Sequence, residues 1–326
     1  MEELKRSISE LLLSEKIEGK ISEITPLTGG ASAETYKFKV TNKKKVSLMV
    51  LRKGSGATSP LAISKKDEAI IQNEVFQQGA PVAEIIAISK ENSLLKDAYI
   101  MKLVEGESIA RKVLRDKRFS EARKNLAFEC GQALAKIHSV SLDSFSKVPR
   151  NDPKELLDNL YLTYKQFKQP LPVFEYTFRW LREQEFIEIE PSLVHGDFRL
   201  GNIIVNEKGL AAVIDWELVN IGNPIQDLGW MCVNSWRFGN DEKVVGGFGD
   251  LKDLIKGYSS ISDLDINESE IKKWQVFGSL RWGVICLIQT FSHLNGPSNS
   301  VERAAIGRRV SETEIDMINL MYLGGK

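Results

Sequence analysis

The stretch of residues 193–217, LVHGDFRLGNIIVNEKGLAAVIDWE, constrains the fold of this chain most strongly. Its two short apolar runs, IIV and LAAVI, are β-prone, and NEKG between them has the composition of a tight turn. An antiparallel hairpin of these runs, centred on residues 207–209, places Asn202 across from Ile214 and close to Asp215. The sequence therefore predicts a hairpin whose open end carries an amide and a carboxylate side by side.

The polar residues around this open end have the spacing that a metal-dependent transfer reaction requires. An amide oxygen from Asn202 and a carboxylate from Asp215 are the hard oxygen ligands that Mg²⁺ prefers. Asp197 lies five positions before Asn202 and is expected to project beside the metal, where a general base for an incoming hydroxyl is needed. His195 is expected to be a packed, hydrogen-bonded brace of the same loop.

Each of these residues, taken alone, is more often a turn, capping or packing residue than a functional one. Together they form the pattern H-x-D-x-x-x-x-N, strand, turn, strand, Asp. This pattern matches the catalytic loop and the metal-binding Asp of kinases. The joint spacing, rather than any single residue, therefore favours catalysis.

Composition limits the class of protein. The chain has 326 residues, 44 Lys+Arg and 44 Asp+Glu, and the resulting zero net charge argues against a protein built mainly to bind nucleic acid. Its three cysteines lie far apart in apolar contexts, which predicts buried, reduced thiols of a cytoplasmic protein. The charged N-terminus does not read as a signal peptide. No stretch reaches the roughly 18 apolar residues of a membrane span, so we expect no membrane association.

The predicted secondary structure changes from mainly β-strand to mainly helix near residue 105. Residues 1–19 read as an amphipathic helix, and a β-rich run follows, with a hairpin over TYKFKV, TNKKK and VSLMVLR. KKDEAIIQNEVFQQG predicts a helix that ends at Gly79, and IIAISK and AYIMKLV complete a small antiparallel sheet. Long helical patterns dominate the remainder. We therefore predict a two-lobed α+β fold, with a β-rich lobe at 1–104 and a helical lobe at 105–326.

HGDFRLGN followed by VIDWE resembles the aminoglycoside phosphotransferase family, the small-molecule relatives of protein kinases. The DWE form, with IGNPIQDLGW after it, most resembles the branch that includes the kinase domains attached to some acyl-CoA dehydrogenases. The resemblance runs from about residue 20 to about residue 290 and implies a protein-kinase-like fold. It also implies ATP, Mg²⁺ and transfer of the γ-phosphoryl group to a hydroxyl of a small molecule. Asp227 in NPIQDLGW matches a family Asp that braces the catalytic-loop backbone.

The same resemblance assigns residues of the β-rich lobe to the nucleotide. The turn LTGGASAETY offers Gly29, Gly30 and Ser32 for close approach to phosphate oxygens. Arg52, in the strand VSLMVLRK, stands where most kinases have a Lys that binds the α- and β-phosphates, and a guanidinium can do the same. Lys53 is the fallback, although strand alternation points it to the opposite face.

Further along the lobe, Glu74 matches the acidic partner of the strand cation, with a solvated helical Glu as the open alternative. AYIMKLVEGES resembles the strand and connector that close over adenine. Met101 would lie behind the base, and the backbone of Lys102 and Val104 would face its edge. His138, at the end of a helical pattern, is expected to be a packing residue.

The phosphate acceptor is the least determined feature. Residues 106–326 carry 28 basic and 30 acidic side chains with no marked acidic cluster, which argues against a polycationic antibiotic. The resemblance points instead to a hydroxy acid or hydroxyacyl compound, and an aromatic cage for choline is a further possibility. Two other classes stay open: a nucleotide-binding regulatory module without turnover, and a metal-dependent hydrolase. The hydrolase leaves the Gly pair, Arg52 and Glu74 unexplained.

Overall fold

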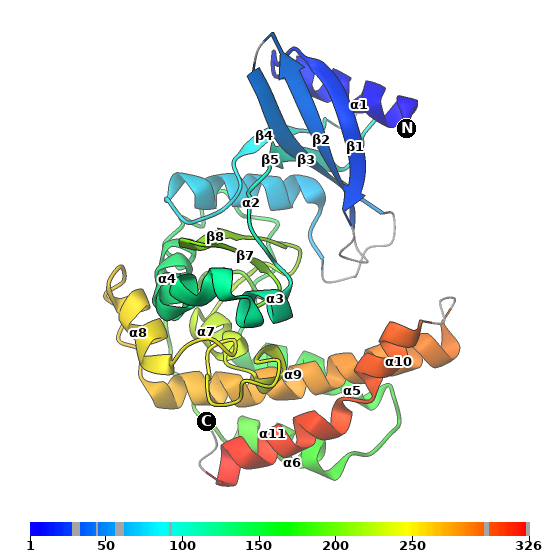
Figure 1. The fold of residues 1–326 in the computed structure, drawn as a ribbon. Helices are drawn as coiled ribbons and strands as arrows, with labels where there is room; N and C mark the ends of the chain where they lie inside the picture. The colour runs from blue at the N-terminus through cyan, green and yellow to red at the C-terminus, as the bar shows by residue number, and fades with distance from the viewer. Residues whose placement is uncertain (28–32, 44, 56–61, 91–92, 297–299, 324–326) are drawn as a thin grey trace.

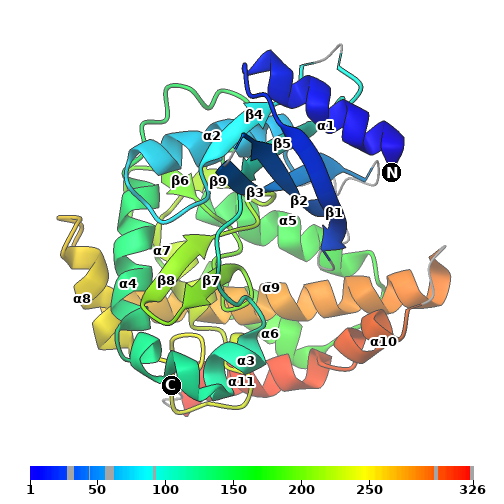
Figure 2. The same cartoon turned by 45° about the horizontal axis from the view of Figure 1, so that its top comes forward.

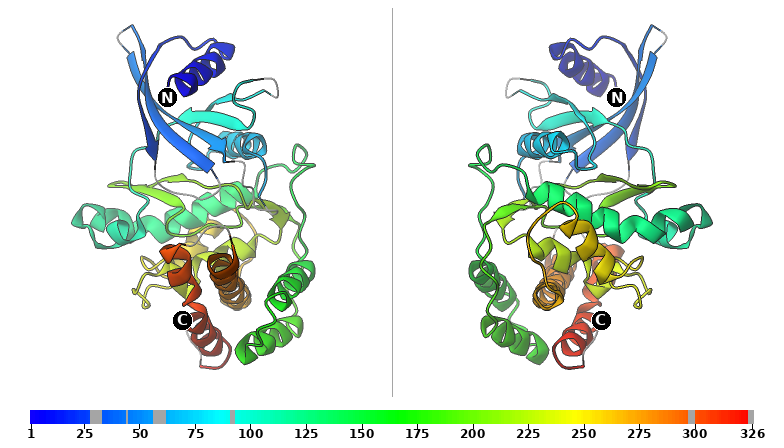
Figure 3. Two further views of the ribbon diagram at one scale, coloured as in Figure 1. Left: turned by 90° about the vertical axis from the view of Figure 1, so that its right-hand side faces the viewer. Right: turned by 90° about the vertical axis from the view of Figure 1, so that its left-hand side faces the viewer.

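A five-stranded β-rich lobe stacks on a larger helical lobe (Figures 1 and 3). The N-terminus lies in the β-rich lobe, and the last helix lies at the far end of the helical lobe (Figure 1). The computed structural model describes residues 1–27, 33–43, 45–55, 62–90, 93–296 and 300–323. No helix in these ranges is long and apolar enough to cross a membrane. The architecture agrees with the predicted two-lobed α+β fold.

The sheet of the β-rich lobe is antiparallel, in the order β1-β2-β3-β5-β4. Its strands are β1 (Lys20–Leu27), β2 (Ala33–Asn42), β3 (Lys45–Gly54), β4 (Ile85–Ile88) and β5 (Ala98–Lys102). Alternate side chains of β2 and β3, including Phe38 and Leu51, are buried in one cluster with Ile8 and Leu11 of helix α1 (Glu2–Ser14). The predicted β2–β3 hairpin is confirmed, and its register closes with Asn42 opposite Lys45.

Two helix ends illustrate what local sequence controls. Helix α2 (Lys65–Gln77) begins after Ser64, whose hydroxyl accepts the backbone N–H of Asp67, and it ends just before Gly79, which has φ +74°. Helix α1 ends at Ser14 rather than near residue 19, because Lys16 takes a left-handed conformation with φ 60°. The predicted end of α2 is therefore confirmed, and the predicted length of α1 is wrong by about a turn.

The helical lobe is organised around the long helix α9, which runs across the lobe (Figure 1). The helical lobe holds one continuous apolar core, to which α4, α7, α9 and α11 all contribute. Its helices are α3 (Ala110–Arg115), α4 (Ser120–His138), α5 (Pro153–Lys165), α6 (Pro172–Arg182), α7 (Ile225–Met231), α8 (Leu251–Ser259), α9 (Glu268–Asn295), α10 (Val301–Gly307) and α11 (Val310–Tyr322).

Two small antiparallel strand pairs carry the predicted catalytic segment. They are β6 (Ser192–Val194) with β9 (Asn220–Gly222), and β7 (Ile203–Asn206) with β8 (Gly209–Val213). The β7–β8 pair lies beside α4, on the side of the helical lobe that faces α2 (Figures 1 and 2). Ile203 pairs with Val213, and Ile214 N–H donates to Asn202 O over 2.9 Å. The predicted register at the open end is confirmed.

Candidate active site

Asp197 is the centre of a hydrogen-bonded group at the open end of the hairpin. Its side chain is 15% exposed. Its Oδ1 accepts the indole N–H of Trp230 at 2.7 Å and Nε of Arg199 at 3.0 Å, and its Oδ2 accepts the amide of Asn202 at 2.6 Å. Hydrogen bonds to charged carboxylates are stronger than those between neutral groups. The carboxylate is therefore held in one orientation, with its edge still open to solvent.

Asn202 and Asp215 present the two oxygen ligands that the sequence predicts. Both hydrogen bonds of the Asn202 side chain are made by its amide nitrogen, to the backbone O and Oδ2 of Asp197, so the amide oxygen is left for another partner. Asp215 follows β8 directly, and the Ile214–Asn202 backbone bond holds it beside Asn202. An amide oxygen and a carboxylate form a donor set that fits Mg²⁺, whose remaining positions are taken by water or phosphate. No group of three or more His, Cys, Asp or Glu side chains in the described ranges is arranged so that it could hold a metal ion.

Asp215 connects the two lobes through Arg52. Its backbone has φ 71°, a left-handed conformation that Asp tolerates better than most residues, and its Oδ1 lies 3.0 Å from Nη2 of Arg52 on β3. Burial by itself raises the pKa of Asp215, but the charge and hydrogen bond of Arg52 outweigh it, so the pKa is lowered from 3.8. The carboxylate is therefore ionised near neutral pH, as a metal ligand must be.

The predicted catalytic loop, residues 195–202, is braced by Asp227 on α7. Its carboxylate accepts the backbone N–H groups of His195 at 2.8 Å and Gly196 at 2.9 Å, and it also contacts Nε2 of His138 at 3.1 Å. Gly196 has φ +78°, and a Cβ there would lie 2.2 Å from Leu218 O, so the position between His and Asp requires glycine. These contacts are those of a brace, the role expected of Asp227.

His195 is fully buried and joins the loop to the end of β8. Its Nδ1 accepts the backbone N–H of Asp197 at 3.2 Å, so its Nε2 carries the proton and donates to Ile214 O at 3.1 Å. Burial lowers the pKa of His195 below its usual 6.5, and the neutral ring is consistent with both hydrogen bonds. The ring also packs 4.7 Å from the ring of Trp216. His195 thus holds Asp197 and Asp215 in register without facing a substrate.

The acidic neighbour of Arg52 differs from the sequence prediction. Glu68, one turn into α2, has an oxygen 3.9 Å from Nη2 of Arg52, whereas Glu74 makes no ion pair with any described residue. Glu74 lies six residues further along the helix, about 240° around its axis, so it faces away from β3. The prediction of Glu74 as the acidic partner is therefore wrong. Lys53 pairs with Glu34 at 3.1 Å, on the opposite face of β3 as expected.

The connector between the lobes, which follows β5, has backbone hydrogen-bonding groups that remain available to a ligand. The N–H of Lys102 donates to Glu84 O at 2.9 Å, so that group is taken, and only the carbonyl of Lys102 could meet a nucleotide. Among the described residues, the N–H of Val104 donates to no partner. Met101 lies on β5 between Val50 and Ile85. Gly29, Gly30 and Ser32 lie outside the described residues.

The comparisons with known proteins identify the family. Residues 23–263 match the sequence profile of the phosphotransferase enzyme family. The chain belongs to that family. Among curated proteins, mouse acyl-CoA dehydrogenase family member 10 is 28% identical over 246 residues, covering 72% of this chain and 22% of the relative. Human acyl-CoA dehydrogenase family member 11 is 29% identical over 190 residues, 54% of this chain and 24% of the relative. The chain spans less than a third of the length of these relatives.

Solved structures support the kinase-like fold of this family member. A Ralstonia eutropha protein assigned to the aminoglycoside phosphotransferases superposes with a TM-score of 0.76 at 22% identity, covering 100% of this chain and 98% of that one. An aminoglycoside phosphotransferase in complex with streptomycin and ATP superposes with a TM-score of 0.61 at 17% identity, covering 98% and 97%. At these identities the likeness establishes the fold.

Sequence reasoning missed two residues that contact the carboxylate of Asp197. Arg199 follows Asp197 by two positions, and its spacing alone could have indicated a contact. Trp230 lies 33 positions away, and only its place in DLGW, three residues after Asp227, gave a signal. A further cation, Arg281 of α9, donates to Gly196 O at 3.0 Å and lies 4.8 Å from the ring centroid of Trp230.

Replacement of Trp230 by Phe should lower kcat about tenfold, because a hydrogen bond to a charged group is worth roughly 1.5–3 kcal/mol. The phenyl ring keeps most of the packing but cannot donate to Asp197. KM for ATP should be unchanged, because Trp230 is in the helical lobe. Steady-state kinetics of purified Trp230→Phe with varied ATP measures both constants.

Trp236→Phe is the matched control. Trp236 stacks on Trp230 with 5.2 Å between ring centroids and lies 4.6 Å from the Arg199 guanidinium, but its indole N–H makes no hydrogen bond to the protein. Its kcat should stay within about twofold of the wild type, because no hydrogen bond to Asp197 is lost. An equal loss in both variants would show that ring packing, rather than the hydrogen bond, is what matters.

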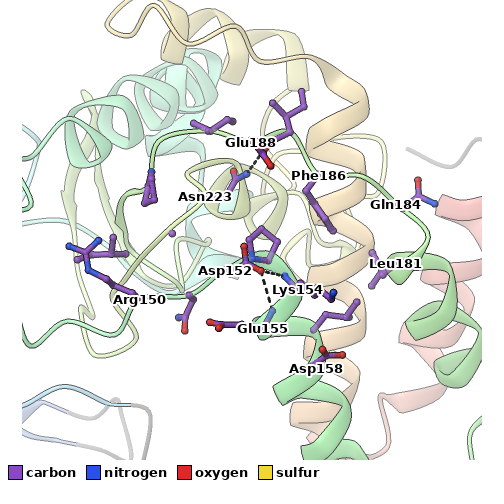
Figure 4. A pocket seen from close by; sticks show the side chains of 18 of the residues that line it. Arg150, Asp152, Lys154, Glu155, Asp158, Leu181, Gln184, Phe186, Glu188 and Asn223 are labelled. Atoms are coloured by element: carbon purple, nitrogen blue, oxygen red, sulfur yellow. Dashed lines mark hydrogen bonds between the residues drawn. The ribbon is translucent and has the colours of Figure 1, made fainter.

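A large cavity of the described chain is separate from this site. It has a volume of about 1090 Å³ and is lined by residues 150–155 with the first turns of α5, by the end of α6, by residues 186–191 and by β9, with none of residues 195–202 (Figure 4). Asp152 at its edge caps α5 by accepting the backbone N–H groups of Lys154 and Glu155. Its other charged residues are of both signs, so the cavity favours no single class of ligand.

Proposed function

We propose that this chain is an ATP- and Mg²⁺-dependent small-molecule kinase that phosphorylates a hydroxyl group. One observation carries the proposal: Asp197, Asn202 and Asp215 converge at one end of the β7–β8 hairpin, while Arg52 from the other lobe contacts Asp215. A hydrolase or a packing role for these residues does not require a cation delivered from the β-rich lobe. The family and the fold agree with phosphoryl transfer.

In the proposed reaction, Asp197 accepts the proton of the acceptor hydroxyl. The oxygen of that hydroxyl forms a bond to the γ-phosphorus, the bond from phosphorus to the ADP oxygen breaks, and the proton passes from Asp197 to solvent. Trp230 and Arg199 hold the carboxylate toward the acceptor. Much of such a reaction depends on positioning, which the rigid loop supplies.

Asn202 and Asp215 would hold Mg²⁺, which when bound neutralises phosphate charge and orients the transferred group. Arg52, whose Nη2 lies 3.0 Å from Oδ1 of Asp215, contributes a further positive charge beside that carboxylate. The cation of Arg52 is permanent, because a guanidinium does not lose its proton in proteins. A nucleotide would lie between β3 and the hairpin, with adenine against Met101 and the connector. ATP is the ligand named in the streptomycin complex of a structural neighbour.

For the acceptor we propose a hydroxy acid or a hydroxyacyl compound. Arg199 places a partly exposed cation next to Asp197, with 3.0 Å between its Nε and Oδ1 of Asp197. This cation suits an anionic acceptor better than a polycationic antibiotic. The curated relatives are named as acyl-CoA dehydrogenase family members, which supports the same choice. We further propose a cytoplasmic protein that binds neither nucleic acid nor membrane.

ADP release from ATP and Mg²⁺ across a panel of acceptors tests the proposal. The panel contains hydroxy acids, hydroxyacyl-CoA thioesters, choline and kanamycin-type aminoglycosides. Turnover with the acids or thioesters supports both the reaction and the acceptor class. Turnover with choline or kanamycin alone supports the reaction and overturns the acceptor. An ATP-induced rise in melting temperature without turnover across the panel would favour a nucleotide-binding regulatory module.

A further inference from the structure

Four charged side chains form a network between β3, the start of α2 and the end of β8, and three of the four are largely buried. Arg52 and Lys65 are the cations, and Glu68 and Asp215 are the carboxylates. The side chain of Lys65 is 4% exposed and that of Glu68 is fully buried. The hydroxyl of Tyr99 on β5 donates to Oε2 of Glu68 at 3.3 Å. The network is electrically balanced, with one cation for each carboxylate.

The pairing inside this network is unequal. Nζ of Lys65 donates a hydrogen bond to Oε1 of Glu68. Nη2 of Arg52 lies 3.0 Å from Oδ1 of Asp215 but 3.9 Å from Oε2 of Glu68, which is beyond hydrogen-bonding distance. The charge of Glu68 is therefore matched mainly by Lys65, and the hydrogen bond of Arg52 goes to Asp215.

A buried carboxylate without a partner is expensive, so Glu68 must recruit a cation from its surroundings. Arg52 is the only other cation that an ion pair joins to it among the described residues. If Lys65 were absent, the guanidinium would be drawn toward Glu68 and away from Asp215. Burial already raises the pKa of Glu68, while Arg52 and Lys65 oppose that rise.

We propose that Lys65 is a positioning residue for the nucleotide site: it supplies the counter-charge of Glu68 and so leaves Arg52 to serve Asp215 and the phosphates. This inference rests on the proposed kinase function. Lys65 is suited to the task because it begins α2, where the Ser64 cap fixes the start of the helix. A helical i,i+3 pair on the surface would contribute little to stability and would leave Arg52 unaffected.

Charge-compensating variants test the proposal. Lys65→Met should raise the Kd and KM for ATP about tenfold, because Arg52 is diverted to Glu68. The double variant Lys65→Met/Glu68→Gln removes both charges of the pair and should return Kd and KM to within about threefold of the wild type. Lys65→Arg keeps the charge and should stay near the wild type. Lys66→Met is the matched control, because Lys66 is the adjacent, exposed lysine and makes no ion pair within the described part of the chain.

Two results would overturn the proposal: wild-type ATP affinity in Lys65→Met, or no recovery in the folded double variant. The second result would mean that Lys65 binds the nucleotide itself. If Lys65→Met fails to fold, the double variant decides alone, since near-wild-type affinity supports the proposal and a tenfold loss contradicts it. Equilibrium ATP binding needs no turnover, so a wrong acceptor or an inactive protein does not obscure the outcome. Absence of turnover with the expected binding pattern would refute only the kinase function.

Discussion

Asp197→Asn should lower phosphate transfer by about 10²–10⁴-fold while ATP still binds. An amide cannot accept the hydroxyl proton, so the acceptor oxygen stays a weak nucleophile. The amide has the same shape as the carboxylate, and its oxygen can still accept the Trp230 or Asn202 hydrogen bond. ATP affinity should change little, because Arg52 and the connector lie in the other lobe. Single-turnover transfer and equilibrium ATP binding measure the two quantities separately.

Asp263→Asn is a control for this substitution, because Asp263 is exposed and its side chain makes no hydrogen bond or ion pair in the described chain. It should behave as the wild type in both measurements. Asp197→Ala should be as inactive as Asp197→Asn, since both lack the base. Transfer at the wild-type rate by Asp197→Asn would remove Asp197 from the mechanism, whatever its contacts.

The sequence predicts the hairpin site well because its determinants are local. Strand periodicity and the NEKG turn fix which residues of β7 and β8 face each other, so the proximity of Asn202 and Asp215 follows from spacing alone. The left-handed backbone conformation of Asp215 could not be predicted from the sequence. It occurs where the chain leaves β8 and Asp215 meets Arg52 of the other lobe.

The sequence predicts the α2 contacts poorly because they depend on tertiary placement. Glu68 and Glu74 both lie in one helix with a weak apolar pattern, and helical spacing shows only that they occupy different faces. Which face meets β3 is decided by packing of α2 between the sheet and the helical lobe (Figure 1). The contact of Trp230 with Asp197 is likewise long-range, since α7 and the catalytic loop meet only after folding.

Asp215→Asn should lower kcat/KM at least about 10²-fold and weaken the response to Mg²⁺, because the proposed metal site loses its only carboxylate. Asn202 and an introduced amide would offer two neutral oxygens, which hold a divalent cation poorly. ADP release measured against Mg²⁺ concentration gives the half-saturating concentration and the maximal rate. The half-saturating Mg²⁺ should rise, and excess Mg²⁺ should recover only part of the rate.

Melting temperatures distinguish the loss of a metal ligand in Asp215→Asn from a loss of folded protein. The pKa of Asp215 is lower in the fold than its usual 3.8, so its carboxylate favours folding at pH values above about 3.8, and that contribution is lost as the pH falls below it. The melting temperature of Asp215→Asn without ligands should therefore be lower than that of the wild type at pH 7, by a few degrees, and the difference should shrink below pH 4.

Arg52→Gln is the matched variant, because it breaks the same ion pair and leaves both proposed metal ligands. It should share the stability loss and raise KM for ATP, yet keep the wild-type dependence on Mg²⁺. An unchanged Mg²⁺ dependence in Asp215→Asn would place the metal elsewhere.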